Sequence, residues 1–489
     1  MSEDIFKSAI IHHGKKNFSK AKEIYESLLK INPNNIAVLE NFSVLLSQTK
    51  NYKKAEEVFI KCLEIKPNDP LVLYNYGKFF HDQKIYDRAI DLYKKSFKVD
   101  GNNHICIYNL GNVYSSLKKF DLSIECFKKS IELNPSNFLA YNNLGFSHKY
   151  KGDFNSAEIF YKKSIDLKSD FIEGHLNYST VLLTLKKFNE GFEEYEWRKK
   201  SKIFSDYLNY SNLKITTPVW KGQSIKNKTI LIFAEQGIGD LFQFSRYLFK
   251  LKEQFECKVI LRLKHNLSHI FDKNHIHVIS EKDKIPNHDF HNHLMSLPGI
   301  FYRINKSFLE NNNFIQSDKK KLEKWKSYFS SFKGLKVGIN ADSTIRAGAT
   351  GQLQRMIPID EFNALTNLKS INFFVLQRDI DKEKIKAINK NGNVNYFEGL
   401  DQSGNPFEDT ISIIKNLDLI ITADTSIAHL SATLERTTWI GLPLICDWRW
   451  FLKSSQSIWY KDVTLFRQKK DRDWKEVLKS IKNRLVKKI

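Results

Sequence analysis

Small and aromatic positions recur every 34 residues along residues 1–200. Each period has a small residue, with one aromatic residue three positions before it and another four positions after it. Side chains with these spacings share one face of a helix, and a small residue there lets a second helix approach. The pattern therefore predicts pairs of packed helices. The small residues are Ala21, Ala55, Ala89, Ser123, Ala157 and Gly191, the preceding aromatics are Phe18, Tyr52, Tyr86, Phe120, Phe154 and Phe188, and the following ones are Tyr25, Phe59, Tyr93, Phe127, Tyr161 and Tyr195.

Turn-forming residues separate the periods, and glycines mark where the two helices of a pair cross closely. The turn-forming residues are Pro33, Pro67, Gly101, Pro135 and Ser169, and the glycines are Gly77, Gly111 and Gly145. The period and the residue types resemble tetratricopeptide repeats, in about six copies. The resemblance implies a right-handed α-solenoid over residues 1–200 whose concave face binds a peptide or a protein. Candidate polar residues on that face are Asn75, Asn109, Asn142 and Asn143.

The pattern changes after residue 200. Residues 201–228 are expected to form an irregular connector that docks through Trp220. Beyond it, short apolar runs alternate with helical segments, which predicts βαβ units and parallel sheets. We expect two Rossmann-like lobes, residues 229–332 and 333–489, with one larger sheet as the structural alternative. The expected strands are 229–234, 258–263 and 277–279 in the first lobe, and 335–341, 372–377, 394–398, 418–423 and 438–442 in the second.

A glycine turn follows the first of these strands. Gly237, Ile238 and Gly239 lead into Asp240, and an apolar-periodic run predicts a helix after it. Asp240 is either a helix cap or a carboxylate at the carboxyl end of a parallel sheet, where α/β proteins bind ligands. The turn lacks the third glycine of a dinucleotide fingerprint and the lysine of a P-loop, so neither nucleotide motif is present.

A second strand, turn and helix are expected around residue 424. Asp424, Thr425 and Ser426 stand at the helix start, and His429 lies one turn into the helix. Free backbone N–H groups, two hydroxyls and an imidazole would converge there, which suits a pyrophosphate or a sugar hydroxyl. The alternative is an ordinary capped helix with His429 packed on the sheet. Arg346 and Arg355, both in the glycine-containing loop of residues 342–356, are candidate phosphate partners.

Composition adds few constraints. An excess of 77 Lys and Arg over 55 Asp and Glu gives a formal net charge of +22, but the lysines are scattered and no nucleic-acid motif accompanies them. The five cysteines form no C-x-x-C pair, and the histidines of residues 265–293 match no zinc pattern, so we expect a reducing compartment and no metal. With no signal peptide or membrane span expected, we predict a cytoplasmic protein and leave peripheral membrane contact open.

From Trp220 to Trp474 the chain resembles the catalytic half of bacterial tetratricopeptide-repeat glycosyltransferases, which is similar to ADP-heptose:lipopolysaccharide heptosyltransferases. Several short motifs in the same order carry the resemblance. They are Glu235-Gln236-Gly237-Ile238-Gly239-Asp240, Arg246-Tyr247, Ser296-Leu297-Pro298, Leu376-Gln377, Asp424-Thr425-Ser426, Ala428-His429-Leu430, Asp447-Trp448-Arg449-Trp450, Trp459-Tyr460, Phe466-Arg467-Gln468 and Asp473-Trp474.

The resemblance implies a GT-B fold with an acceptor-side lobe over residues 229–332 and a nucleotide-sugar lobe over 333–489. It implies metal-independent, inverting transfer of a sugar from a nucleotide-diphosphate sugar, without a cofactor, to a protein or glycan that the repeats recruit. Asp240 would be the general base, and His291 would be a loop residue. Asp424, Thr425, Ser426 and His429 would bind the donor together with Arg355 and Arg346, and Gln236, Gly237, Gly239 and Arg246 would lie on the acceptor side.

The chain also departs from the family pattern. Asn340, Ala341 and Asp342 stand where the family usually carries Trp, a small residue and Gly, and Ala432, Glu435 and Thr437 replace two glycines and a proline. These departures keep a second class of function open, in which the repeats bind a partner and the transferase domain is degenerate and non-catalytic.

Overall fold

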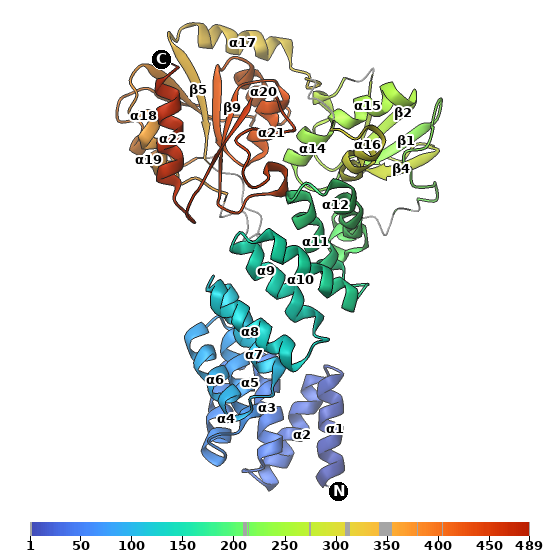
Figure 1. The fold of residues 1–489 in the computed structure, drawn as a ribbon, viewed down its shortest axis with the longest axis vertical. Helices are drawn as coiled ribbons and strands as arrows, with labels where there is room; N and C mark the ends of the chain where they lie inside the picture. The colour runs from blue at the N-terminus through green and yellow to red at the C-terminus, as the bar shows by residue number, and fades with distance from the viewer. Residues whose placement is uncertain are drawn as a thin grey trace. The chain divides into compact units, whose positions relative to one another are not determined.

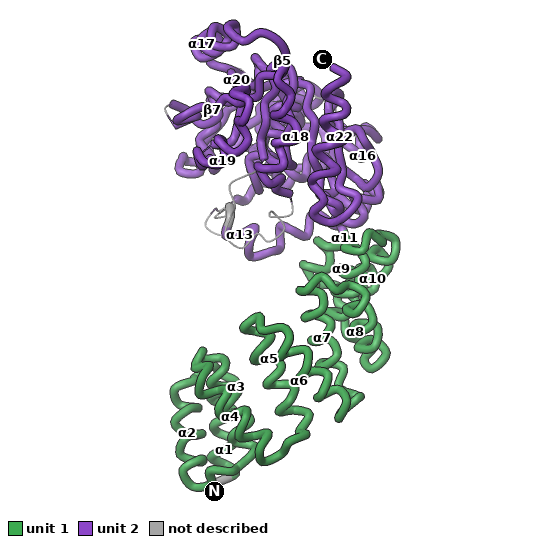
Figure 2. Tube along the Cα trace, turned by 90° about the vertical axis from the view of Figure 1, so that its left-hand side faces the viewer, with its two compact units in different colours: residues 1–178 green, residues 179–489 purple. Residues whose placement is uncertain are grey.

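The computed structural model describes residues 2–208, 213, 215–272, 275–308, 313–341, 355–378, 380–402 and 404–488. The chain divides into two compact units, Met1–Tyr178 and Ser179–Ile489 (Figure 2). The boundary expected at residue 200 therefore lies inside the second unit. No helix in the described ranges combines the length and the apolar character that a membrane crossing requires.

The first unit consists of helices that alternate along the chain as first and second members of pairs (Figure 1). Four of the first helices of these pairs are capped at their N-termini by a side chain. The capping residues are Asn35, Asp69, Asn103 and Asn137. The first members are α1 (Ser2–Gly14), α3 (Ile36–Gln48), α5 (Pro70–Asp82), α7 (His104–Ser116), α9 (Phe138–Tyr150) and α11 (Ile172–Thr184), which crosses the unit boundary. The second members are α2 (Phe18–Ile31), α4 (Tyr52–Ile65), α6 (Tyr86–Val99), α8 (Phe120–Leu133) and α10 (Phe154–Leu167).

The predicted close crossing within each pair is confirmed. A Cβ atom on Gly111 would lie 2.7 Å from a ring carbon of Phe127, and one on Gly77 would lie 2.9 Å from the ring of Tyr93. Successive first helices also contact one another, α3 with α5, α5 with α7 and α7 with α9. Because these helices pack against each other along the solenoid, they form one continuous surface, which we call the inner face.

The second unit starts with the end of α11, followed by α12 (Phe188–Tyr195), the 3₁₀ turn η1 (Glu196–Lys200) and α13 (Lys202–Leu208). Its first sheet is parallel, with strand order β3-β2-β1-β4. The strands are β1 (Thr229–Phe233), β2 (Lys258–Leu263), β3 (His277–Ser280) and β4 (Phe290–His293). The helical segments around this sheet are α14 (Ile238–Phe244), α15 (Arg246–Phe255), η3 (Ser268–Ile270), η4 (Leu294–Ser296) and α16 (Leu297–Asn305).

Strand β4 corrects one expectation, because His291 lies in a strand rather than in a loop. The segment has little apolar character of its own, but its pairing with β1 and the bridge from Val219 to His291 bury it. Trp220 of the connector is fully buried and donates its backbone N–H to the His291 carbonyl at 2.9 Å, so the connector docks through Trp220.

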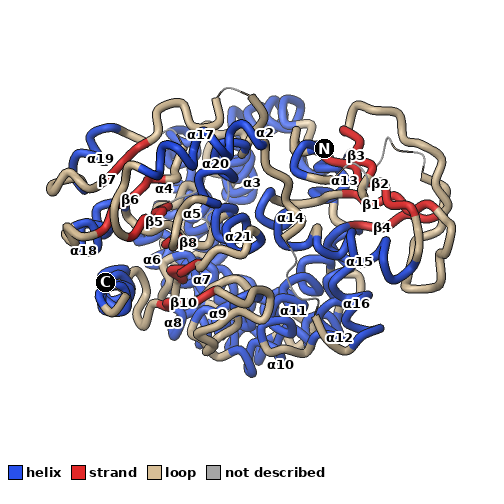
Figure 3. Tube along the Cα trace, turned by 90° about the horizontal axis from the view of Figure 1, so that it is seen from above, coloured by secondary structure: helices blue, strands red, loops and turns tan. Residues whose placement is uncertain are grey.

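The second sheet has six parallel strands in the order β10-β9-β8-β5-β6-β7, so the described strands form two sheets and not one larger sheet (Figure 3). The strands are β5 (Leu335–Asn340), β6 (Ile371–Val375), β7 (Val394–Tyr396), β8 (Leu419–Ala423), β9 (Thr438–Leu442) and β10 (Val463–Arg467), the last of which the apolar pattern did not predict. The accompanying helical segments are α17 (Lys319–Ser330), η5 (Ile359–Phe362), α18 (Asn363–Thr366), α19 (Lys382–Ile388), α20 (Glu408–Lys415), α21 (Ser426–Thr433), η6 (Trp448–Trp450) and α22 (Trp474–Val486).

Strand order places both candidate turns where α/β sheets bind ligands. In the second sheet the order reverses between β5 and β8, and in the first sheet it reverses between β1 and β4. The crevice at the carboxyl ends of such strand pairs is the usual ligand site. The turn carrying Asp240 follows β1, and the turn carrying Asp424 follows β8.

Candidate functional site

Asp240 lies in the first turn of α14 and uses its two oxygens differently. Oδ2 accepts from the backbone N–H of Gly237 at 2.9 Å, so the carboxylate satisfies one free donor of the helix start. Gly237, not Asp240, is the residue that precedes the helix. Oδ1 accepts from Arg449 Nη2 of η6. The side chain is therefore a helix-capping group and one half of an ion pair at the same time.

The turn after β8 is almost completely buried. Asn340 Nδ2 donates to Thr425 Oγ1 at 3.1 Å, so the residue that departs from the family pattern is hydrogen bonded to the turn. His429 Nδ1 lies 3.1 Å from the Tyr460 hydroxyl, and its ring stacks on Trp450. Burial lowers the pKa of His429 to about 3, which leaves a neutral imidazole at neutral pH.

The two helix starts meet at Gly239. A Cβ atom there would lie 3.0 Å from His429 Cδ2 and 3.5 Å from Ser426 Cα, so the approach of α14 to α21 depends on the missing side chain. Farther along, Thr433 Oγ1 donates to the Phe242 carbonyl at 3.2 Å. The structure thus brings together Asp240, Ser426 and His429, which the sequence placed in separate lobes.

Five charged side chains form a continuous row between the two turns, which we call the charge cluster: Asp240, Arg449, Asp447, Arg355 and Asp424. Arg449 Nη1 donates to Asp447 at 2.8 Å, and Arg355 lies 3.6 Å from both Asp447 and Asp424. Burial acts to raise the pKa of Asp447, but Arg449 and Arg355 outweigh it and bring that pKa to about 2. At Asp424 burial dominates over Arg355 and raises the pKa.

No role follows from the sequence for Asp447 and Arg449, two members of the charge cluster. Their place in the motif Asp447-Trp448-Arg449-Trp450 is the sequence feature that points to them. Arg246, expected on the acceptor side, donates to the Trp459 carbonyl at 2.5 Å and lies over the Tyr460 ring. Arg346 and Asp342 lie outside the described residues. In the described part of the chain, His, Cys, Asp and Glu side chains form no group suited to a metal ion.

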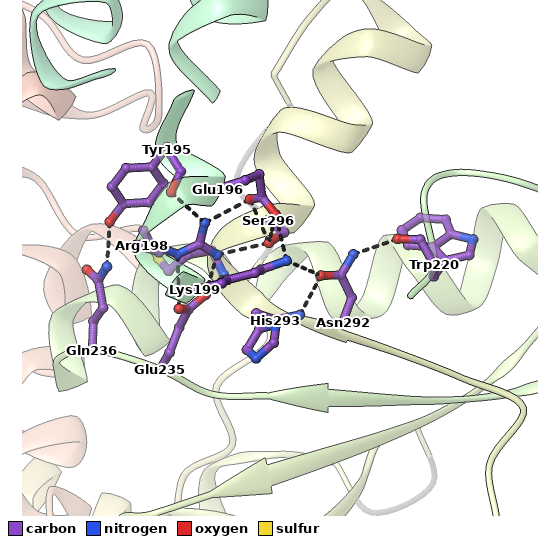
Figure 4. A network of polar contacts seen from close by, with 11 residues as sticks. Tyr195, Glu196, Arg198, Lys199, Trp220, Glu235, Gln236, Asn292, His293 and Ser296 are labelled. Carbon is purple, nitrogen blue, oxygen red and sulfur yellow. Dashed lines mark hydrogen bonds and ion pairs between the residues drawn. The ribbon is translucent and has the colours of Figure 1, made fainter. Parts of the chain in front are cut away.

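A second buried network, which we call the Arg198 network, includes Glu235, which precedes the glycine turn (Figure 4). Arg198 of η1 binds Glu235 in a bidentate way, with Nε to Oε2 at 3.0 Å and Nη2 to Oε1 at 2.7 Å. Its other N–H groups reach Ser296, Glu196 and the Tyr195 carbonyl. All five guanidinium N–H groups therefore have acceptors.

Gln236 lies beside the Arg198 network and is not part of the charge cluster. It was expected on the acceptor side, and its amide donates to the Tyr195 hydroxyl. Its backbone has a positive φ of 66°, an uncommon conformation for a residue other than glycine. The turn between β1 and α14 is thus fixed by contacts from α12 and η1, which sequence reasoning did not connect to it.

Comparison with known proteins supports the repeats. Tetratricopeptide repeat models match residues 13–74, 105–137 and 126–159, so this part of the chain consists of tetratricopeptide repeats. No curated protein matches. Among solved structures, the chain is similar to MamA, at 23% identity over 34% of this chain and 92% of that chain with a TM-score of 0.31. It is also similar to Pseudomonas aeruginosa PilF, at 19% identity over 43% of this chain and 95% of that chain with a TM-score of 0.39. A third similar structure is YrrB, described as a tetratricopeptide repeat protein with an unusual peptide-binding site, at 19% identity over 39% of this chain and 98% of that chain with a TM-score of 0.32.

Proposed function

We propose that this protein is a protein-interaction scaffold that binds a peptide segment of a partner on the inner face of its repeats. A row of asparagines carries the proposal. Asn109 Nδ2 donates to the Tyr74 hydroxyl at 3.1 Å, and Asn143 Nδ2 donates to the Tyr108 hydroxyl at 3.0 Å. Each bond joins residues 35 positions apart, so polar side chains of successive first helices form one continuous strip.

A carboxamide suits a peptide backbone because it offers one acceptor and two donors, the groups that a peptide unit also exposes. The Asn109 carboxamide oxygen accepts no hydrogen bond within the described residues, while its nitrogen is held by Tyr74 and by the Ile105 carbonyl. Because the nitrogen fixes the orientation of the amide, the Asn109 carboxamide oxygen could accept a hydrogen bond from a backbone N–H of a bound segment.

The test uses the full-length chain and a displayed library of random peptides. We expect the wild-type protein to enrich a set of peptides and the triple variant Asn75→Ala, Asn109→Ala, Asn143→Ala to lose it. A matched triple variant on second helices, Lys61→Ala, Lys95→Ala, Lys129→Ala, should enrich the same set as the wild type. Failure of the wild type to enrich any peptide, or equal enrichment by the inner-face variant, would refute peptide binding by this face.

A second candidate function is sugar transfer by the α/β unit, and the charge cluster favours it. Within the described residues, Asp424 Oδ2 and Arg449 Nε are buried and accept or donate no hydrogen bond, although Arg355 lies 3.6 Å from Asp424 Oδ2. Each such group typically costs about 1–3 kcal/mol until it is paired. A nucleotide-diphosphate sugar would offer phosphate oxygens to Arg449 and Arg355 and hydroxyls to Asp424.

In this candidate reaction Asp240 would remove the proton from the acceptor hydroxyl as it attacks the anomeric carbon, and the diphosphate would leave toward Arg355. No metal or cofactor is required by the proposal. Asp240 is paired with Arg449. To act as the base, Asp240 would have to lose this ion pair when the donor phosphate binds the Arg449 guanidinium.

A melting-temperature screen against ADP, GDP, UDP and their sugars tests donor binding. We expect a rise with one nucleotide family that disappears in Arg355→Met. A matched control, Arg303→Met on α16, should keep the rise. If no nucleotide at millimolar concentration raised the melting temperature, donor binding by the α/β unit would be refuted and the scaffold function alone would be favoured.

A further inference from the structure

The inner and outer helices of the repeats differ sharply in charge. The first helix α7 carries no Lys, Arg, Asp or Glu, and α3 and α9 carry one each, Glu40 and Lys149. The second helices α4, α6, α8 and α10 each carry at least four. The first helix α5 carries one opposite pair, Lys78 and Asp82, so from α3 to α9 the inner face has no net formal charge in a chain of +22.

A neutral surface selects an uncharged occupant. A charged side chain seated there would lose water without gaining a counter-charge, which is unfavourable. Lys78, one of the few charges on the first helices, is already paired with Asp82 at 2.7 Å. Charge complementarity thus points to a segment whose contacting residues are apolar or polar but not ionised.

Exposed apolar side chains accompany the asparagine row. Leu71, Ile105 and Leu139 occupy the same position of three successive repeats, with 50%, 48% and 38% of each residue exposed. Each lies four positions before the asparagine of its helix, so the two side chains share one face. Across three repeats the inner face consequently presents an apolar row beside a row of amides.

The spacing of these rows matches the repeat of one extended chain conformation better than that of the other. Packed helices lie about 8–10 Å apart, so one step from repeat to repeat is about 9 Å. A polyproline II segment has three residues per turn and rises about 3.1 Å per residue, which also gives about 9 Å. A β-strand alternates its side chains with a period of two and so cannot present the same face at each step.

We infer that the occupant of the inner face is an uncharged polyproline II segment with an apolar side chain at every third residue. Its apolar residues pack on Leu71, Ile105 and Leu139, one per repeat, while its backbone meets Asn75, Asn109 and Asn143. This inference rests on the proposed peptide-binding function and specifies the partner's chemistry.

Two fluorescently labelled peptides of equal composition test the register on the full-length protein. One contains five Leu-Pro-Ser triplets, and the other contains the same residues with its leucines at every second position. Fluorescence anisotropy should show binding of the triplet peptide at least about tenfold tighter than that of the rearranged one. Ile105→Asp should weaken triplet binding about tenfold or more, because it removes one buried apolar contact.

The matched control is Ile60→Asp on the second helix α4, whose isoleucine is similarly exposed at 45%. It should bind the triplet peptide as the wild type does, and circular dichroism should show unchanged helicity in both variants. Equal binding of the two peptides, equal weakening by the two variants, or no binding of the triplet peptide overturns the inference. In each of these cases, library peptides that require Asn109 would still uphold peptide binding itself.

Discussion

The inner face of the repeats and the charge cluster of the α/β unit are both polar, but they are built in opposite ways. The inner face is half-exposed, carries few charges and is hydrogen bonded from repeat to repeat through pairs such as Asn109 and Tyr74. The charge cluster is ionic, Asp424 and Arg449 in it are buried, and Arg449 Nε has no hydrogen-bond partner among the described residues. Under the functions proposed above, the exposed amide row would receive a polypeptide, and Arg449 and Arg355 of the charge cluster would receive phosphate oxygens.

We also expect the folding stability of the α/β unit to depend on its buried charges far more than the stability of the repeats depends on their amides. The largest effect is expected for Arg198→Met. The substitution leaves the Glu235 carboxylate buried, with only 1% of its side chain exposed, and unpaired. Losing one partner of such a pair typically costs about 3–5 kcal/mol. Urea unfolding of the full chain checks this, with Lys382→Met in an exposed ion pair as a control that should unfold like the wild type.

Acid sensitivity is the next largest expected effect. Burial lowers the pKa of His429 from 6.5 in the unfolded chain to about 3 in the folded one. Between these values the unfolded chain binds a proton that the folded chain does not, so stability falls as pH decreases. From pH 6.5 to 4 the loss is about 3 kcal/mol. In His429→Gln this part of the pH dependence should disappear, whereas exposed His275→Gln should retain it. Parallel profiles for all three proteins would contradict the burial of a neutral imidazole.

Asp240→Asn should lower stability less than Arg198→Met does and should reduce transfer strongly. Asn can still accept from the Gly237 N–H, and although it loses the ion pair with Arg449, that arginine keeps Asp447 as a partner. It cannot remove a proton, and loss of a general base typically reduces a rate about 100–10,000-fold. Melting temperature and sugar transfer are measured on the same preparation. Near-normal transfer by the variant would show that Asp240 serves only as a capping and pairing group.

The smallest effect on stability is expected on the inner face. Asn109→Ala removes a half-exposed hydrogen bond to Tyr74 and should cost about 1 kcal/mol or less. Peptide binding should nevertheless fall clearly, because the lost amide faces the ligand. If Asn109→Ala lowered the free energy of unfolding in urea as much as Arg198→Met does, the predicted difference in stability between the two regions would be wrong.

The repeats could be predicted from the sequence because their contacts are local. Gly77 and Tyr93 belong to the same helix pair, so the 34-residue period contains the packing as well as the helices. The apolar runs likewise predicted most strands of the α/β unit. Strand β4 escaped prediction because its burial comes from β1 and the connector and not from its own side chains.

The candidate site could be predicted only in pieces. The residue types of the Asp240 and Asp424 turns indicated ligand chemistry, but Asp240 and Arg449 are 209 positions apart. Likewise, no periodicity connects Arg198 to Glu235, 37 positions later. Such pairs depend on how the sheets and helices pack, which a single sequence does not specify.

Site-specific photo-crosslinking can detect a peptide bound to the inner face in the cell. A photoreactive phenylalanine analogue replaces Asn109 on the inner face or Lys129 on α8 in the full-length protein. The protein is expressed in its native host and irradiated. We expect a crosslinked partner at position 109 that is absent at position 129, with the crosslink mapping to an uncharged segment of the partner. Equal crosslinking at both positions, or none at position 109, would contradict peptide binding by the inner face.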